Sequence, residues 1–97
     1  MIKHLVLFKR KPDYDKAVFE EMLAGFRSIQ DKIPSVRNMS VGEDFSHRGS
    51  FDVALCCEFE SEEDLRAYGQ HAEHQRLIHD VMSKVVEDKR EVVDYRY

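Results

Sequence analysis

Apolar and polar residues alternate at the start of the chain, and this pattern predicts a β-strand over Ile2–Arg10. Ile2, His4, Val6 and Phe8 share one face of that strand, and Lys3, Leu5, Leu7 and Lys9 share the other. Both faces are apolar near the centre, which is typical of a strand that is covered on both sides.

An amphipathic helix is predicted over residues 14–32, because its apolar residues recur every three or four positions. Pro12 ends the preceding strand, and either Asp13 or Asp15 could cap the start of the helix. Pro34 ends the helix, since the residue before a proline is pushed out of helical geometry. The apolar stripe consists of Val18, Met22, Phe26, Ile29 and Ile33.

Two more strands follow, a weaker one over 36–43 and a stronger one over 51–59, with a polar loop over 44–50 between them. Gly42 indicates a bulge or an early end of the weaker strand. The stronger strand has one fully apolar face, made of Phe51, Val53, Leu55, Cys57 and Phe59.

A second helical region begins at Ser61, which forms a capping box with Asp64. Gly69 permits an interruption, and a last strand is predicted over 89–97. The helical piece after the interruption is marked by Leu77, Ile78, Val81, Met82, Val85 and Val86.

The order β-α-β-β-α-β predicts an α+β, ferredoxin-like subunit: a four-stranded antiparallel sheet with helices on one face, in a single domain over 1–97. Two helices cover only one face of such a sheet. The other face would expose an apolar set that normally marks an interface. We therefore expect a homodimer through the sheet face, two copies closing a barrel around a shared cavity. A less apolar open face would instead leave a monomer. The expected set is Ile2, Val6, Phe8, Val53 and Leu55.

Composition narrows the function classes. The 97 residues carry a net charge of -4, which argues against a nucleic-acid binder, and the basic run at 9–11 is expected to be a solvated strand end.

Cys56 and Cys57 are neighbours on a strand, point to opposite faces and should not form a disulfide. Free thiols suit a reducing compartment. The chain shows no apolar run of membrane-spanning length and no signal-peptide pattern, so we expect a cytoplasmic protein without a membrane partner.

Histidines are the main candidates for chemistry. His4 lies on an apolar strand face, where it is either a hydrogen-bonded core residue or part of a cavity. His71 and His74 would share a helix face, and His74 could act as a base near neutral pH with Tyr68 or His4 as its partner. For His71 the favoured role is to cap or hydrogen-bond the helix break at Gly69. A metal site made of His4, His71, His74 and Glu73 is the alternative, although the spacing of a HExxH helix is absent. We assign no role to His47 or His79 and expect no cofactor, because the chain has no glycine-rich phosphate loop and no nucleotide fingerprint.

Several segments resemble the stress-responsive dimeric α/β-barrel (Dabb) domain family, and together they cover nearly the whole chain. The most specific is 68–74, Tyr-Gly-Gln-His-Ala-Glu-His, which is similar to the Tyr-x-x-His-Pro-x-His of the family. The opening 2–9, the Pro-Ser-Val of 34–36, Val41-Gly42 and the stretch 51–65 fit the same pattern.

The resemblance implies a ferredoxin-like subunit and a dimeric barrel but no single activity. Some members are associated with stress responses, and a polyketide cyclase subgroup uses His and Tyr residues of the pocket for acid–base work. This chain differs at Ala72, where the family often has proline, and at Val53, where such a cyclase carries a further pocket histidine. The candidate catalytic residues are His74, Tyr68 and His4, and the candidate ligand-binding residues are His4, Val6, Val53, Tyr68, His71 and His74.

Three functions are compatible with the sequence. The first is a stress-response barrel that binds a small apolar molecule without turnover. The second is a cofactor-free enzyme that moves protons on a ketone-like or polyketide-like ligand, with His74 as base and Tyr68 or His4 as partner. The third is a structural oligomer whose interface is filled by side chains.

Overall fold

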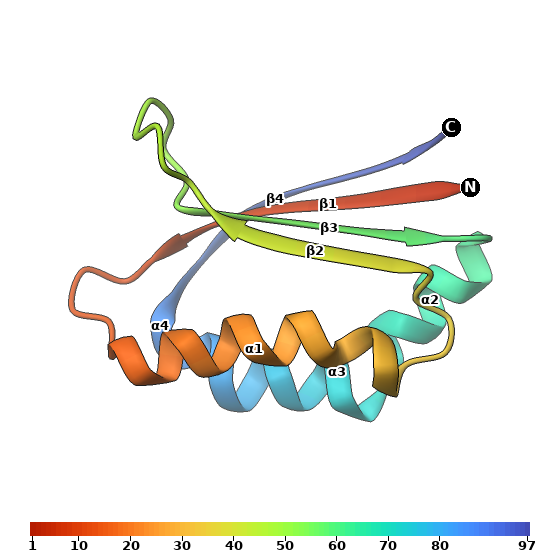
Figure 1. The fold of residues 1–97 in the computed structure, drawn as a ribbon, viewed down its shortest axis with the longest axis horizontal. Helices are drawn as coiled ribbons and strands as arrows, with labels where there is room; N and C mark the ends of the chain where they lie inside the picture. The colour runs from red at the N-terminus through yellow and green to blue at the C-terminus, as the bar shows by residue number, and fades with distance from the viewer.

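The computed structural model describes residues 1–97 and contains one antiparallel sheet in the order β2-β3-β1-β4. Its strands are β1 (Ile2–Arg10), β2 (Asn38–Glu43), β3 (Val53–Phe59) and β4 (Val86–Arg96). The two central strands are β1 and β3 (Figure 1). The chain ends lie side by side, where the Tyr97 amide donates to the Met1 carbonyl at 3.1 Å.

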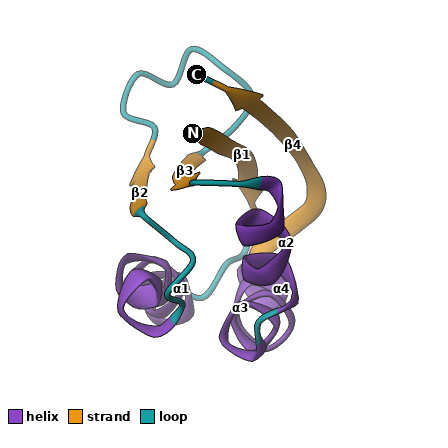
Figure 2. Ribbon diagram, turned by 90° about the vertical axis from the view of Figure 1, so that its right-hand side faces the viewer, coloured by secondary structure: helices purple, strands orange, loops and turns teal.

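All helices lie on one face of the sheet, as predicted (Figures 1 and 2). One column is α1 (Lys16–Lys32), beneath β2. The other is α2 (Glu62–Gln70), α3 (Ala72–Arg76), the π-helical segment η1 (Leu77–Met82) and α4 (Ser83–Val85), beneath β1 and β4. The loop between β2 and β3 rises on the side of the sheet away from the helices (Figure 1). The predicted ferredoxin-like subunit is confirmed.

Polar side chains set the helix boundaries. Asp15 rather than Asp13 caps α1, and its carboxylate accepts from the amides of Ala17 and Val18 at 2.9 and 3.3 Å. The Ser61 hydroxyl accepts from the Asp64 amide at 3.1 Å, so the predicted cap of α2 is confirmed. The interruption falls at the extended residue His71, two positions after the predicted glycine, because the His71 ring caps the next helix.

Three strands begin at other residues than predicted. The second strand begins at Asn38 rather than at residue 36. The last strand begins at Val86 rather than at residue 89, because the helical column ends at Val85 and the chain turns directly into the sheet. The third strand begins at Val53 rather than at Phe51, and Asp52 instead holds the turn, its carboxylate accepting from the Arg10 amide at 2.8 Å.

The apolar core lies between the sheet and the helices. It contains residues that were predicted to lie on the open face of the sheet, so that prediction is wrong. Ile2, Phe8, Val53 and Leu55 are at most 5% exposed and face the helices. The reason is side-chain size, since the face that carries phenylalanines on both central strands packs against the apolar stripe of α1. The face away from the helices carries a different apolar set: Leu5, Leu7, Ala54, Cys56, Val93 and Tyr95.

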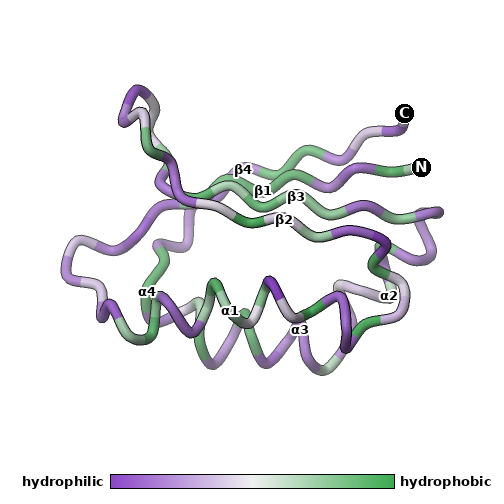
Figure 3. Tube along the Cα trace, in the orientation of Figure 1, coloured by the Kyte–Doolittle hydropathy of each residue, from purple (hydrophilic) through white to green (hydrophobic).

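Hydropathy along the trace follows this division. Apolar segments run through the middle of the central strands and alternate with polar segments along the helices, and much of the β2–β3 loop is polar (Figure 3). No helix has both the length and the apolar character needed to cross a membrane.

Candidate functional site

A cavity of about 180 Å³ lies between the sheet and the helices of a single subunit. The strands β1 and β4 form its roof, and α2, α3 and η1 form much of its floor. Most of its lining is apolar, and its polar groups are two histidines, a tyrosine and an arginine. The lining residues are His4, Val6, Phe8, Phe26, Leu55, Tyr68, His74, Ile78, Met82, Arg90 and Val92.

His4 is held by a carboxylate on the neighbouring strand. It lies directly opposite Asp94 in the register of β1 with β4, so both side chains point toward the helices. The His4 Nδ1 donates to the Asp94 Oδ1. This bond fixes the ring orientation and leaves Nε2 as the nitrogen available to a ligand.

Tyr68 lies on α2 between the two histidines. Its ring centroid is 6.1 Å from that of His4 and 4.3 Å from that of His74. Burial, together with the neighbouring Cys57, raises the pKa of the Tyr68 hydroxyl above its ordinary value. The hydroxyl therefore stays protonated near neutral pH, where it can donate a hydrogen bond but cannot act as a base.

His74 sits at the start of the second helical piece, and the backbone there fixes its tautomer. Its Nδ1 donates to the Gly69 carbonyl at 3.2 Å, which leaves the Nε2 lone pair free. Burial lowers the pKa of the His74 imidazole, although the bond to Gly69 acts in the opposite direction. A neutral imidazole with a free Nε2 is the form that a general base requires.

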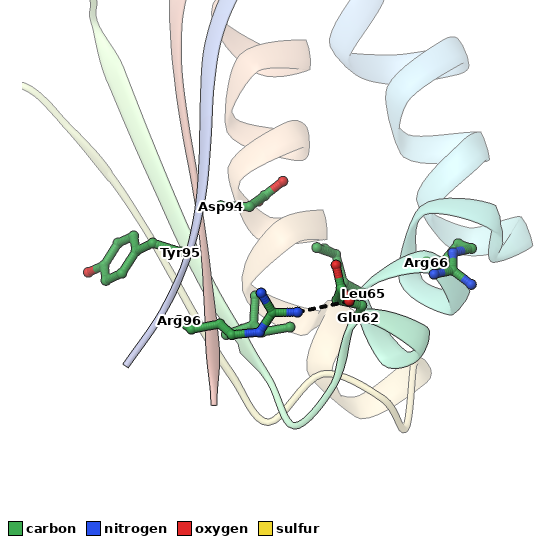
Figure 4. Close-up of a pocket in the computed structure, with 7 residues that line it drawn as sticks. Glu62, Leu65, Arg66, Asp94, Tyr95 and Arg96 are labelled. Carbon is green, nitrogen blue, oxygen red and sulfur yellow. Dashed lines mark ion pairs between the residues drawn. The ribbon is translucent and has the colours of Figure 1, made fainter.

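A second hollow of about 400 Å³ lies near the C-terminal end of β4, and it is lined by Ile2, Glu62, Leu65, Arg66, Asp94, Tyr95 and Arg96. Figure 4 shows Asp94 pointing from β4 toward the helices, whereas Tyr95 points to the opposite side of the sheet. Arg96 and Glu62 form an ion pair at 2.8 Å across this hollow, joining β4 to α2. Asp94 thus borders the outer hollow while it holds a side chain of the inner cavity.

The structure brings four of the predicted ligand-binding residues together: His4, Val6, Tyr68 and His74. It does so inside one subunit, so the prediction that these histidines face a space enclosed by two sheets is wrong. The reason is that the β1 face carrying His4 turns toward the helices.

Two predicted residues lie elsewhere. Val53 is buried but does not line the cavity. His71 faces a separate shallow hollow near Ile33 and Asp64, and its Nδ1 accepts from the Glu73 amide at 3.1 Å. The alternative of a metal site at His4, His71, His74 and Glu73 is not supported, since no three potential ligands of these types converge in the structure.

Sequence reasoning missed two polar residues of this region, Asp94 and Arg90. Asp94 stands opposite His4 and Arg90 stands opposite Phe8 in the register of β1 with β4. Each belongs to the polar half of an alternating strand and therefore looks like an ordinary surface residue. Only the strand register, which the sequence does not state, places them on the cavity side.

Comparisons with known proteins agree with this architecture. A stress-response A/B barrel domain-containing protein of Arabidopsis thaliana is 27% identical over 90 residues, and these cover 91% of this chain and 34% of that protein. The chain thus spans about a third of the length of that curated relative.

Among solved structures, a dimeric protein of unknown function with a ferredoxin-like fold from Bacteroides fragilis is 27% identical. It has a TM-score of 0.82, with 99% of this chain and 95% of that chain covered. A hydroxynitrile lyase from Passiflora edulis has the same TM-score of 0.82 at 16% identity, with 97% of this chain and 90% of that chain covered, and it shares the fold.

The family model described as the stress responsive A/B barrel domain matches residues 2–97. Its match begins at the first residue of β1 and ends at the last residue of the chain, so it includes His4, Tyr68, His74 and Asp94. This chain belongs to the stress-responsive A/B barrel domain family.

Proposed function

We propose that this protein is a stress-response barrel protein that binds a small, largely apolar molecule between its sheet and its helices. The observation that carries the proposal is the cavity itself, whose lining is mostly apolar with a few converging polar groups. Ligand sites commonly combine an apolar wall with a small number of such groups. The cavity is smaller than the several hundred Å³ typical of drug-sized ligands, so the occupant is a compact molecule.

Thermal unfolding with phenylacetone as the probe tests this binding. Val6 lines the cavity, and Val6→Trp would fill it, whereas Ala24→Trp adds the same ring on the exposed side of α1. We expect phenylacetone to raise the melting temperature of the wild type and of Ala24→Trp but not of Val6→Trp. An equal rise in the two variants would contradict the proposed site.

Proton transfer on the bound molecule is the second candidate function, and the state of His74 favours it. Its Nδ1 is committed to the Gly69 carbonyl, burial keeps the ring neutral, and Tyr68 lies 4.3 Å away, centroid to centroid. Nε2 would take a proton from the carbon beside a carbonyl group, and the protonated Tyr68 would stabilise the enolate oxygen that forms. The hydroxynitrile lyase of the same fold is a relative with a named enzymatic activity.

Exchange of the α-protons of phenylacetone in deuterated buffer, followed by NMR, tests this reaction. We expect His74→Gln to lower the enzyme-dependent rate by about 100-fold or more, the usual contribution of a general base. His79→Gln is the matched control, because His79 is exposed on η1 and bonds to Gln75 at 2.9 Å. Unchanged exchange in a folded His74→Gln protein would remove the catalytic role, while retained stabilisation by phenylacetone would leave the binding role intact.

We also propose that two copies associate through the sheet face away from the helices. Dimeric ferredoxin-like neighbours support self-association. The face itself supports the location, since it carries exposed apolar side chains and a hollow of about 560 Å³ between the strands and the β2–β3 loop. Exposed apolar surface of this kind is typical of an interface.

Sedimentation of Leu7→Glu beside Ala24→Glu tests the interface. Leu7 is 38% exposed on the open face, and Ala24 is exposed on α1. We expect only Leu7→Glu to shift the protein toward monomer, because an unpaired carboxylate would be buried between two sheets. Cys56 also lies on the open face, so its alkylation should become faster in Leu7→Glu. If both variants sedimented alike, the interface would lie elsewhere.

The cysteines bear on location as well. Cys56 and Cys57 are both free thiols, and their side chains point to opposite faces of β3. Burial raises the pKa of the Cys57 thiol to about 12. These features support a reducing compartment such as the cytoplasm.

A further inference from the structure

Arg90 is a cation on the wall of an otherwise mostly apolar cavity. It projects from β4 toward the helices, opposite Phe8 in the strand register. Its Nη1 contacts the Met82 Sδ at 3.7 Å, and it forms no ion pair. A guanidinium has five N–H donors, and a thioether is a weak acceptor. The strongest donor group in the cavity is therefore left without an anionic partner.

The carboxylates near Arg90 are directed elsewhere. Glu91, the next residue on β4, points to the opposite face of the sheet. Asp94 points to the same side as Arg90, but it accepts the hydrogen bond from His4. The remaining polar side chains of the cavity are His4, Tyr68 and His74, and none of them is an anion. The chain therefore provides a partly buried positive charge with no counter-charge of its own.

We propose that Arg90 recognises a carboxylate on the bound molecule, so that the ligands of this cavity are small apolar organic acids. The inference rests on the proposed ligand-binding function and names the class of ligand for that site. The planar guanidinium matches a carboxylate with two parallel hydrogen bonds, and such charge-assisted pairs are about twice as strong as neutral ones. The surrounding Val6, Phe8 and Ile78 remove water from the pair and cover an apolar ligand body.

The same contact would orient the ligand. Arg90 lies on the β4 side of the cavity, and Tyr68 and His74 lie on α2 and α3. A molecule whose carboxylate is held at β4 would direct its remaining atoms toward these two rings. Inorganic phosphate lacks the apolar body that the remaining wall would cover, so it should bind more weakly than a carboxylic acid of matching size.

Calorimetric titration with phenylacetate and phenylacetamide tests the inference, since the two probes share a shape and differ in charge. In the wild type, phenylacetate should bind at least tenfold more tightly than phenylacetamide. Arg90→Gln should remove this preference while leaving the affinity for the amide within about twofold. Arg90→Lys should keep part of the preference, because the lysine ammonium retains the positive charge but cannot form the two parallel hydrogen bonds of a guanidinium. Arg27→Gln is the matched control, as Arg27 is exposed on α1 and forms no ion pair.

The cavity-filling variant separates the failure of this inference from the failure of the proposed function. The role of Arg90 would be overturned if phenylacetate and phenylacetamide bound with equal affinity to the wild type and to Arg90→Gln. If Val6→Trp then abolished the binding of both probes, the ligand site itself would stand. Binding that Val6→Trp does not reduce would overturn the site and the inference together. Tighter binding of inorganic phosphate than of phenylacetate would also overturn the inference, because the ligand would then be a hydrated anion.

Discussion

The space between the sheet and the helices has two halves that are built differently. The half over α1 is tightly packed, and five residues of that helix are buried there: Phe19, Met22, Leu23, Phe26 and Ile29. The strand β3 adds four more buried side chains. Burial of this extent accounts for much of the stability of a small domain, and only Phe26 and Leu55 of these side chains border the ligand cavity.

The half over α2, α3 and η1 is looser and more polar. The strand β4 has eleven residues, yet only Val86 among them is buried, and its helix-facing side carries Arg90, Val92, Asp94 and Arg96. The imidazoles of His4 and His74 lie in this half, around the cavity. The difference indicates that one half stabilises the fold, while the other half provides the space and the polar groups for a ligand.

Large-to-small substitutions should separate the two halves most clearly. Phe19 is 1% exposed and packs edge-on against Tyr14, with 5.3 Å between the ring centroids. Phe19→Ala should therefore lower the free energy of unfolding by about 3–5 kcal/mol. Val92 is 50% exposed at the border of the cavity, so Val92→Ala should cost less than about 1 kcal/mol. Urea denaturation of both variants measures the difference, and similar losses would mean that the open half carries as much stability as the packed one.

The helix contact between the halves gives a smaller expected effect. A Cβ atom on Gly25 of α1 would lie 2.6 Å from the Cδ1 of Leu77, a buried residue of η1, whereas a Cβ atom on Gly69 would meet nothing within 4 Å. Gly69→Ala should therefore raise the free energy of unfolding by about 0.5–1 kcal/mol through helix propensity. Gly25→Ala has the same backbone gain but an overpacking cost of about 1–3 kcal/mol. If both variants were stabilised equally, Leu77 would have to move aside at no cost in free energy when Gly25 gains a methyl group.

The packed half is the part that the sequence predicts well. The apolar stripe of α1 and the alternation of β3 are strong periodic signals, and both elements were placed correctly apart from small shifts at their ends. The cap at Ser61 was also predictable, because a capping box depends only on neighbouring residues. Local patterns of this kind survive folding because tertiary packing reinforces them.

The open half was only partly predictable. His4, Tyr68 and His74 were identified, but the sequence placed them between two sheets, because β1 is apolar on both faces and its pattern does not say which face meets the helices. Asp94 and Arg90 were missed, since their roles depend on the register of β4 with β1. The π-helical η1 was missed as well, because its apolar spacing resembles that of an ordinary helix. Each of these features is set by contacts between distant parts of the chain.

The smallest expected effect concerns the charge of His74. Burial lowers the pKa of this imidazole in the folded protein below the ordinary value of about 6.5, whereas the unfolded chain keeps that value. Between the two pKa values the unfolded state binds more protons, so the free energy of unfolding rises with pH in this window. The contribution of neutral His74 is complete above about pH 6.5 and is lost as the pH falls through the folded-state pKa.

Denaturation of the wild type and of His74→Gln between pH 5 and 8 measures this contribution as the difference between the two curves, which includes the interactions of His74 with His4 and His79. The difference curve should slope upward with pH below about 6.5 and be flat above it. A slope of the opposite sign would mean that the cavity stabilises a protonated His74. In that state Nε2 would carry a proton and could donate to a ligand but not accept from one, which would reverse the role proposed for this residue.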